Sequence, residues 1–171
     1  MKSRVPIVAI AVIAVIAGAV LATAAWWIRG SWSNQEPEWL LSIAGSSALS
    51  VPNGDGTHTV TLSDVSPLVV AFTDRPQREA DSWVTTDVVN DWSVLFAGSA
   101  PNAVLAGQRE DGSYVEVPIT VTSPSLQDSS LVFTGVALPG DGTDQLGDSS
   151  VINGPVYVFV DGSCTQLPSP G

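Results

Sequence analysis

Residues 102–122 read NAVLAGQREDGSYVEVPITVT. In the second half of this stretch, apolar residues occupy every second position, namely Val115, Val117, Ile119 and Val121. Such alternation is typical of a β-strand with one buried face, so we expect a strand over residues 113–122 and a partner strand over residues 102–108. Glu110-Asp111-Gly112 between them predicts a tight turn. Because Pro118 cannot donate a backbone hydrogen bond, we expect its strand to lie at a sheet edge or to be bulged.

The same pattern continues on both sides of this hairpin. Runs rich in Val, Ile, Thr and aromatic residues alternate with clusters of Gly, Pro, Asp and Asn, and residues 52–56 (PNGDG) predict a second hairpin turn. Further strands are expected over residues 39–50, 57–63, 67–73, 130–138 and 155–161. We therefore predict a mainly β, β-sandwich-like domain over residues 39–163.

Residues 85–96 interrupt the β pattern. Apolar residues recur there at helical spacing, namely Val88, Val89, Trp92, Leu95 and Phe96. Thr85 or Thr86 can cap the start of this helix and Gly98 can end it. We predict one amphipathic helix that covers an open end of the sandwich, with Trp92 as its anchor.

An apolar run without any charged residue covers residues 5–28. A helix of about 20 residues crosses a hydrocarbon core about 30 Å thick, so the run predicts a transmembrane signal-anchor helix. Lys2 and Arg4 precede it, which places residues 1–4 in the cytoplasm as a short stub and the rest of the chain outside, in a single-pass cell-membrane protein. A cleaved signal peptide is the alternative, since Ala22-Thr23-Ala24 fits a cleavage site.

Two short segments flank the predicted domain. Residues 29–38 are largely polar and contain a proline, which indicates a linker. Residues 164–171 end in LPSPG, which indicates a flexible tail that begins at Cys164, beyond the last predicted strand.

The charge and the rare residues exclude several classes of protein. The net charge is −11, and after residue 29 only Arg75, Arg78 and Arg109 stand against 17 carboxylates, which leaves −14. Such a domain repels nucleic-acid phosphates, so we expect no nucleic-acid partner. A single cysteine and a single histidine, His58, argue against a disulfide framework, a structural zinc site and a Ser-His-Asp triad. We expect His58 to face solvent, and we expect no cofactor.

Acidic turns offer weak calcium candidates. Asp141, Asp144 and Asp148 place carboxylate oxygens on one loop, which suits a hard cation. Their spacing differs from that of an EF-hand loop, and ordinary solvated turns are the better explanation. We therefore expect no metal site.

The densest unusual motif runs from Phe72 through Thr73, Asp74, Arg75 and Pro76 to Arg78. With Trp92, Phe96 and Pro101-Asn102-Ala103-x-Leu105, it resembles a family of secreted or membrane-anchored bacterial proteins of uncharacterised function. That family shares F-[ST]-D-R-P-x-R, a tryptophan, a phenylalanine and P-P-N-A-x-L. The chain departs from it at Ala100, in place of the first proline, and at Asp81, in place of a frequent glycine. The resemblance implies a β-rich fold outside the cytoplasm and transfers no catalytic residue.

Two interpretations of these motif residues remain open. In the structural one, Asp74, Arg75 and Arg78 tie a loop together, while other motif residues act as anchors of the fold: Phe72, Pro76, Trp92, Phe96, Pro101 and Asn102. In this interpretation the Asn102 side chain bonds to nearby backbone. In the functional one, Arg75 and Arg78 bind an anion, because guanidinium groups form paired hydrogen bonds with carboxylates.

These observations favour a non-catalytic protein. The expected function is an interaction module anchored in the bilayer by residues 5–28 and serving as an accessory subunit of a larger membrane protein complex, with respiratory complexes among the candidates. Its acidic body would favour a basic partner. The alternative is an envelope ligand-binding or enzymatic domain that uses Arg75 and Arg78 as an anion site, with Asp74 or Glu79 as proton acceptor.

Overall fold

The structure is a computed structural model that describes residues 38–73, 78–139 and 150–164. These residues form eight strands and two short helices: β1 (Trp39–Pro52), β2 (His58–Ser63), β3 (Leu68–Thr73), β4 (Ala80–Val84), α2 (Thr85–Asn90), α3 (Trp92–Leu95), β5 (Asn102–Gln108), β6 (Tyr114–Gln127), β7 (Ser130–Ala137) and β8 (Ser150–Cys164). The prediction of a mainly β domain with a short helical segment is confirmed. The predicted anchor over residues 5–28 lies outside the described residues.

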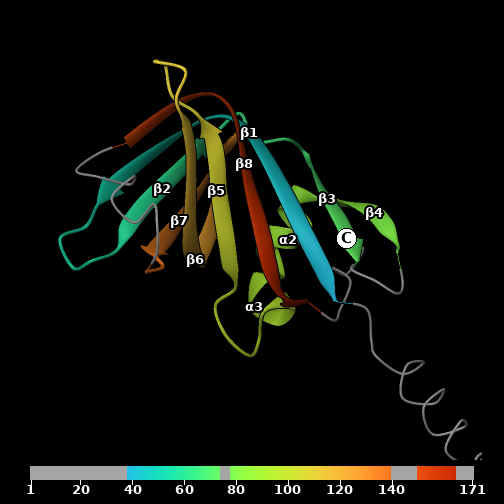
Figure 1. The fold of residues 1–171 in the computed structure, drawn as a ribbon. Coiled ribbons are helices and arrows are strands. Elements are labelled where there is room, and N and C mark those ends of the chain that lie inside the picture. Colours follow the sequence, from blue (N-terminus) through green and yellow to red (C-terminus); the bar gives the residue numbers. More distant parts are fainter. Residues whose placement is uncertain (1–37, 74–77, 140–149, 165–171) are drawn as a thin grey trace, which may run out of the picture. The chain divides into compact units, whose positions relative to one another are not determined.

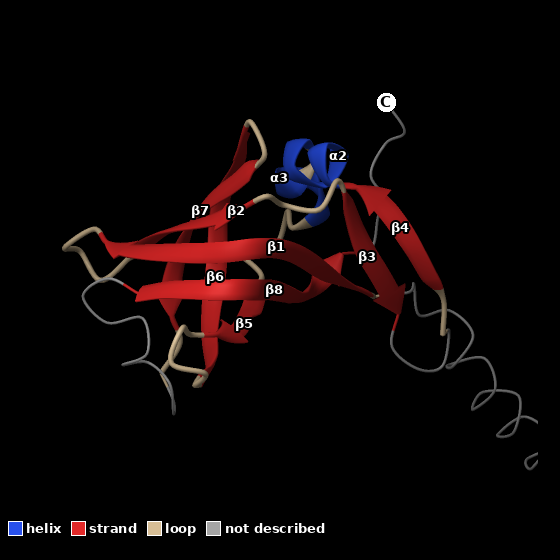
Figure 2. Ribbon diagram, turned by 90° about the horizontal axis from the view of Figure 1, so that it is seen from above, coloured by secondary structure: helices blue, strands red, loops and turns tan. Residues whose placement is uncertain are grey.

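Six of the strands close into a ring. The order around the ring is β1, β2, β7, β6, β5 and β8, and β8 pairs with β1 again. Every pairing is antiparallel, and opposite walls face each other across one core, as in the sandwich-like arrangement that the sequence favoured. β3 and β4 extend the sheet from the first half of β1 (Figure 1). Figure 2 shows these two strands standing apart from the ring, with the helices beside them.

β1 belongs to both parts because it changes its neighbour along its length. Residues 39–42 pair with β3, whereas residues 47–52 pair with β2. The pairing of β1 with β8 shifts register between Gly45 and Ser47, which marks a bulge, and a bulge bends a strand and increases its twist. A side chain at Gly45 would lie 3.0 Å from the Ser63 carbonyl oxygen, so glycine allows the close approach there.

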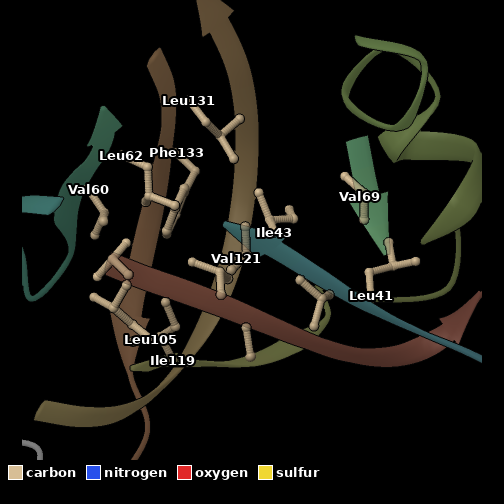
Figure 3. Close-up of a cluster of buried hydrophobic side chains, with 14 of the residues drawn as sticks. Leu41, Ile43, Val60, Leu62, Val69, Leu105, Ile119, Val121, Leu131 and Phe133 are labelled. Atoms are coloured by element: carbon tan, nitrogen blue, oxygen red, sulfur yellow. The ribbon is translucent and has the colours of Figure 1, made fainter. Parts of the chain in front are cut away.

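The core fills the inside of the ring. Figure 3 shows apolar side chains from opposite walls meeting there, and the buried residues that it labels on the ring strands are Leu41, Ile43, Val60, Leu62, Leu105, Ile119, Val121, Leu131 and Phe133. The four alternating residues of β6 predicted from sequence are all buried, at 2% exposure or less. Burial of each such side chain stabilises the fold by about 1.5–3 kcal/mol.

β6 is an interior strand, so the expectation of an edge position for Pro118 is wrong. The carbonyl oxygen of Pro118 accepts a hydrogen bond from the Leu138 backbone N–H at 2.8 Å. The backbone N–H and C=O of a strand residue point to the same neighbouring strand. The N–H that Pro118 lacks would therefore point just beyond the end of β7. The strand is bulged, as expected, but the register shift lies between Thr122 and Ser125.

The helical segment divides into two short helices at Asp91. The residue before α2 is Val84, which makes no capping bond through its side chain. Thr85 is the first helical residue and donates its hydroxyl proton to the Ser66 carbonyl oxygen at 2.7 Å, so the predicted threonine cap is wrong. α3 ends at Leu95, before the predicted stop at Gly98.

The two helices bury Val88, Trp92 and Leu95 of the predicted apolar face, whereas Val94 is exposed. Trp92 is buried and its ring lies 4.5 Å from the ring of Phe96. α2 contacts β3 and β4 on one side and β6 on the other, so it connects the two-stranded extension to the wall opposite β1. Among the residues that the structure describes, neither helix is long and apolar enough to span a bilayer.

β4 was missed by the sequence analysis and forms the free edge of the sheet. Hydrogen bonds from Thr73 N to Glu79 O (2.9 Å) and from Thr85 N to Pro67 O (3.0 Å) fix its pairing with β3. In an antiparallel ladder, pairs of residues that exchange backbone hydrogen bonds alternate with pairs that do not. Ser82 belongs to a pair that does not, so its backbone N–H and C=O point away from β3. The Ser82 N–H donates to its neighbour's carboxylate, Asp81 Oδ1, at 2.7 Å.

Trp83 faces inward from β4, and its ring centre lies 5.1 Å from that of Trp39 on β1. Its Nε1 is buried, and no described residue accepts a hydrogen bond from it. An unpaired buried donor costs about 1–3 kcal/mol, so the apolar contacts of this ring pair must offset that cost.

Both predicted hairpin turns are confirmed. In the β5–β6 turn, Gly112 adopts φ 83°, and Asp111 accepts hydrogen bonds from the hydroxyl and the backbone N–H of Ser113. In the β1–β2 turn, Asp55 accepts the same two bonds from Thr57. These bonds, the hydroxyl bond first, lower the pKa of each aspartate because they favour the charged carboxylate.

Candidate docking surface

The outside of the sheet carries a band of exposed apolar side chains. They lie on β5, β8, β3 and β4, and β1 runs between β8 and β3. Each side chain is between 36% and 50% exposed. We call this band the outer apolar face, and it consists of Leu68, Val70, Phe72, Val84, Val104, Tyr157 and Phe159. In Figure 1, α2 and α3 lie on the far side of these strands.

Strand pairing makes these side chains neighbours. Ser42 on β1 pairs with Val70 on one side and with Phe159 on the other. Phe159 in turn pairs with Val104 on β5, and its ring stacks on that of Tyr157 at 6.0 Å. The band therefore extends across the sheet, with the half-buried Ser42 between its two parts in this row. Soluble monomers rarely expose contiguous apolar patches of this kind, and such patches mark interaction sites.

The sequence carries the signal for this face in two unbroken apolar runs, LVVAF at residues 68–72 and VYVFV at residues 156–160. Runs without polar alternation are typical of strands covered on both sides. The inward residues of both runs are buried in the core. Within residues 38–73, 78–139 and 150–164, the other side has no cover. The apolar runs between turn residues were enough to locate both strands, and the absence of polar residues within the runs is the further signal for a second covered side.

A groove of about 260 Å³ lies in the outer apolar face, near the start of β1. Its apolar lining includes Leu40, Phe72, Val104, Pro118 and Phe159. Leu40 and Phe72 face each other across the β1–β3 pairing, and Val104 pairs with both Phe159 and Pro118. The groove therefore crosses five strands and carries polar groups only at one end, where Asn102 and Asp161 line it.

A more polar pocket of about 300 Å³ adjoins the groove. Glu38, Phe96 and Pro101 line it, and it shares Asn102 and Asp161 with the groove. We call it the polar pocket. Glu38, Asn102 and Asp161 are exposed, and their side chains form no hydrogen bond or ion pair with any described residue.

Four predicted anchor residues meet at these two hollows. Phe72 lines the groove, Phe96 and Pro101 line the polar pocket, and Asn102 lines both. Pro101 is buried and its carbonyl oxygen accepts a hydrogen bond from Val121 N at 3.0 Å, which fits the anchoring role. The expectation that the Asn102 side chain bonds to nearby backbone is wrong within the described ranges. No sequence pattern singles out Glu38 and Asp161.

The predicted arginine site is described only in part. Asp74, Arg75 and Pro76 lie outside the described residues. Arg78 is exposed, has φ 56°, and lines neither the groove nor the polar pocket. A positive φ is uncommon for a residue with a side chain and costs roughly 1–2 kcal/mol. Arg78 and Arg109 are the basic residues of the described part of the chain.

His58 lies on a strand as expected, at the start of β2, and is half-buried, on the same side of the strand as the buried Val60. Its Nδ1 lies 3.1 Å from Oγ of Ser50, a hydroxyl that is 2% exposed. A buried hydroxyl needs a hydrogen-bond partner, and His58 supplies one. A nucleophile must also reach its substrate, which a serine buried to this degree does not, so the contact is structural.

No group of metal-ligating side chains that could hold a metal ion occurs among the described residues. The weak calcium candidates Asp141, Asp144 and Asp148 lie outside that part of the chain. In comparisons with protein families, with curated proteins and with solved structures, none matches this chain.

Proposed function

We propose that this protein is a membrane-anchored, non-catalytic interaction module that docks through its outer apolar face onto a larger membrane protein complex. The single observation that carries this proposal is the outer side of strands β3 and β8, which no described residue covers and whose all-apolar runs are typical of strands covered on both sides. A partner surface would provide that cover. The resemblance to secreted or membrane-anchored bacterial proteins supports an extracytoplasmic position for the domain.

The length of the linker supports a partner in or near the membrane. Nine residues, 29–37, separate the proposed anchor from Glu38. At about 3.5 Å per extended residue they reach roughly 30 Å, so an anchored domain stays close to the bilayer surface. Complexes that project from a membrane, those of respiratory chains included, offer surfaces within that reach.

The composition of the face supports a protein partner. Aromatic residues dominate the energetics of protein interfaces, and the outer apolar face contains Phe72, Tyr157 and Phe159. The described residues carry 12 acidic and two basic side chains, which opposes binding to nucleic acid and to anionic lipid headgroups.

The test compares two valine variants of the full chain. Membranes that contain wild type, Val70→Asp or Val94→Asp are solubilised in mild detergent, and the complex is quantified by native electrophoresis and affinity capture. Val70 lies in the outer apolar face and is 50% exposed, whereas Val94 lies on α3 and is 56% exposed. We expect Val70→Asp to reduce the captured complex at least tenfold, because docking would bury a charge, while Val94→Asp leaves it unchanged.

Two results would count against this function. One is migration of the wild-type chain as a lone monomer under these conditions. The other is equal capture by both variants. N-terminal sequencing of the mature protein tests the anchor separately, because cleavage after Ala24 would release the domain from the membrane.

The alternative function, an anion site at Arg75 and Arg78, has one observation in its favour. Arg78 is exposed in a strained backbone conformation, and such strain occurs at ligand sites. If Arg78→Gln abolished binding of an acidic envelope component without affecting capture of the complex, the anion site would be a second function of the domain.

A further inference from the structure

We propose that the groove and the polar pocket together bind a partner segment in which an apolar side chain lies beside an arginine. The apolar side chain occupies the groove, and the guanidinium group binds Asp161 and Glu38. This inference rests on the proposed function and specifies the chemistry of the partner at one end of the outer apolar face.

The dimensions of the two hollows fit side chains better than a whole small molecule. Pockets that enclose small ligands measure roughly 300–1,000 Å³. The groove measures about 260 Å³ and the polar pocket about 300 Å³, and both are open to solvent. Each therefore has room for one or two side chains from a surface that covers it.

The strand register holds the apolar and acidic parts together. Asp161 pairs with Leu40 on one side and with Asn102 on the other, so its carboxylate lies in the row next to Phe159 and Val104. A segment whose apolar side chain enters the groove would carry its next polar group towards Asp161. Glu38 lines the polar pocket together with Asp161.

The charges and donors at this point favour a cation, and arginine in particular. Asp161 and Glu38 are acceptors that no described cation neutralises, and the Asn102 amide oxygen adds a third acceptor. A guanidinium group offers five donors in a planar fork, which can serve several acceptors at once, whereas an ammonium group acts as a point charge. Leu40 and Phe72 provide an apolar border along which the stem of the side chain can lie.

The direct test uses a matched set of peptides and the full chain in phosphatidylcholine nanodiscs, with empty nanodiscs as the blank. The labelled probes are blocked peptides with the central sequence Leu-Arg-Leu, Leu-citrulline-Leu or Leu-Glu-Leu, and binding is followed by fluorescence anisotropy. Citrulline keeps the shape of arginine and removes its charge. We expect the arginine peptide to bind at least tenfold more tightly than the citrulline peptide, and the glutamate peptide not to bind.

Charge-matched variants locate the site. Asp161→Asn and Glu38→Gln should each weaken binding of the arginine peptide at least fivefold, and Val104→Asp should abolish it. Asp55→Asn removes the same charge from the turn at the opposite end of β1 and should have no effect. Equal binding of the arginine and citrulline peptides, equal effects of Asp55→Asn and Asp161→Asn, or no saturable binding at about 1 mM peptide would each overturn the inference.

Capture of the complex separates this inference from the function on which it rests. If the Asp161→Asn and Glu38→Gln chain still captures the complex from solubilised membranes while Val70→Asp does not, the docking function stands and the arginine site is overturned. Parallel loss of capture and of peptide binding in the acidic variants supports both.

Discussion

Gly107 should be the least replaceable small residue of the described ring. It lies on β5, opposite Val115 of β6. A Cβ added there would lie 2.5 Å from Ile152 Cγ2 and 2.7 Å from Val156 Cγ2, both on β8. Carbon atoms prefer separations of about 3.5–4.0 Å, so β8 would have to move by roughly 1 Å or the two side chains would have to leave their rotamers.

The cost of Gly107→Ala follows from that overlap. Adding a methyl group to a packed core costs about 1–3 kcal/mol, and two contacts below 3 Å place this site near 2 kcal/mol. For a domain of this size, that loss lowers Tm by roughly 5–10 °C. Urea unfolding of the full chain in mild detergent, followed by near-UV circular dichroism, measures the free energy of unfolding.

Gly98→Ala is the matched control. A Cβ at Gly98 meets no atom within 4 Å, and its φ is not in the left-handed region. Its stability should therefore stay equal or rise by up to about 1 kcal/mol. A change at Gly107 as small as that at Gly98 would refute the reasoning.

A double-mutant cycle tests the cause of the loss. Ile152→Ala removes the nearest atom and by itself should cost about 2–5 kcal/mol, because Ile152 is buried. If overlap causes the loss at Gly107, the double variant should lose at least about 1 kcal/mol less than the sum of the single variants. Strict additivity would show that the loss has another origin.

Three further predictions concern polar contacts. Thr57→Val should raise the pKa of Asp55 towards its ordinary value of 3.8. The lowered pKa of Asp55 stabilises the fold above that pH, and this stabilisation is lost as the pH falls through the pKa of the folded state. The stabilisation should therefore be smaller in Thr57→Val, and carboxyl-carbon NMR titration measures the pKa. Ser82→Pro should change the free energy of unfolding by less than about 1 kcal/mol, because the N–H it removes points away from β3, and a loss above about 2 kcal/mol would show that the pairing is wrong. Thr85→Val should cost about 1 kcal/mol by removing a buried hydrogen bond, whereas exposed Thr86→Val should stay within about 0.5 kcal/mol in the same urea assay.

Local pattern was enough to locate seven of the eight described strands. Over residues 102–122, the alternation, the turn sequence and the lengths of the runs all predict a hairpin, and the structure contains it. β4 escaped because its sequence, ADSWV, turns a single large apolar residue, Trp83, towards the core. The helical segment starts at Thr85 as expected, but the Thr85 hydroxyl bonds to Ser66 in the β2–β3 connection and not to the start of the helix, and nothing in the local pattern predicted the division at Asp91.

The closed ring could not be predicted from local pattern. It depends on β1 pairing with both β2 and β8, and the pairs between β1 and β8 range in sequence separation from 100 (Ser50 with Ser150) to 125 residues (Trp39 with Cys164). The candidate site could be predicted only in part, because it too depends on pairing between strands that are distant in sequence. Phe72, Phe96, Pro101 and Asn102 were singled out as a motif, but their meeting with Glu38 and Asp161 follows from strand register.

The order in which the ring is completed has a consequence for biogenesis. β8 is the last of the described strands to be synthesised, and it fills the place between β1, the first of them, and β5. Until β8 is in place, the apolar inner faces of the other strands and the edges of β1 and β5 stay exposed. Exposed apolar faces and unpaired strand edges promote incorrect association of nascent chains. Folding should therefore wait for nearly the whole polypeptide, and a chain truncated before residue 150 should depend on chaperones or be degraded.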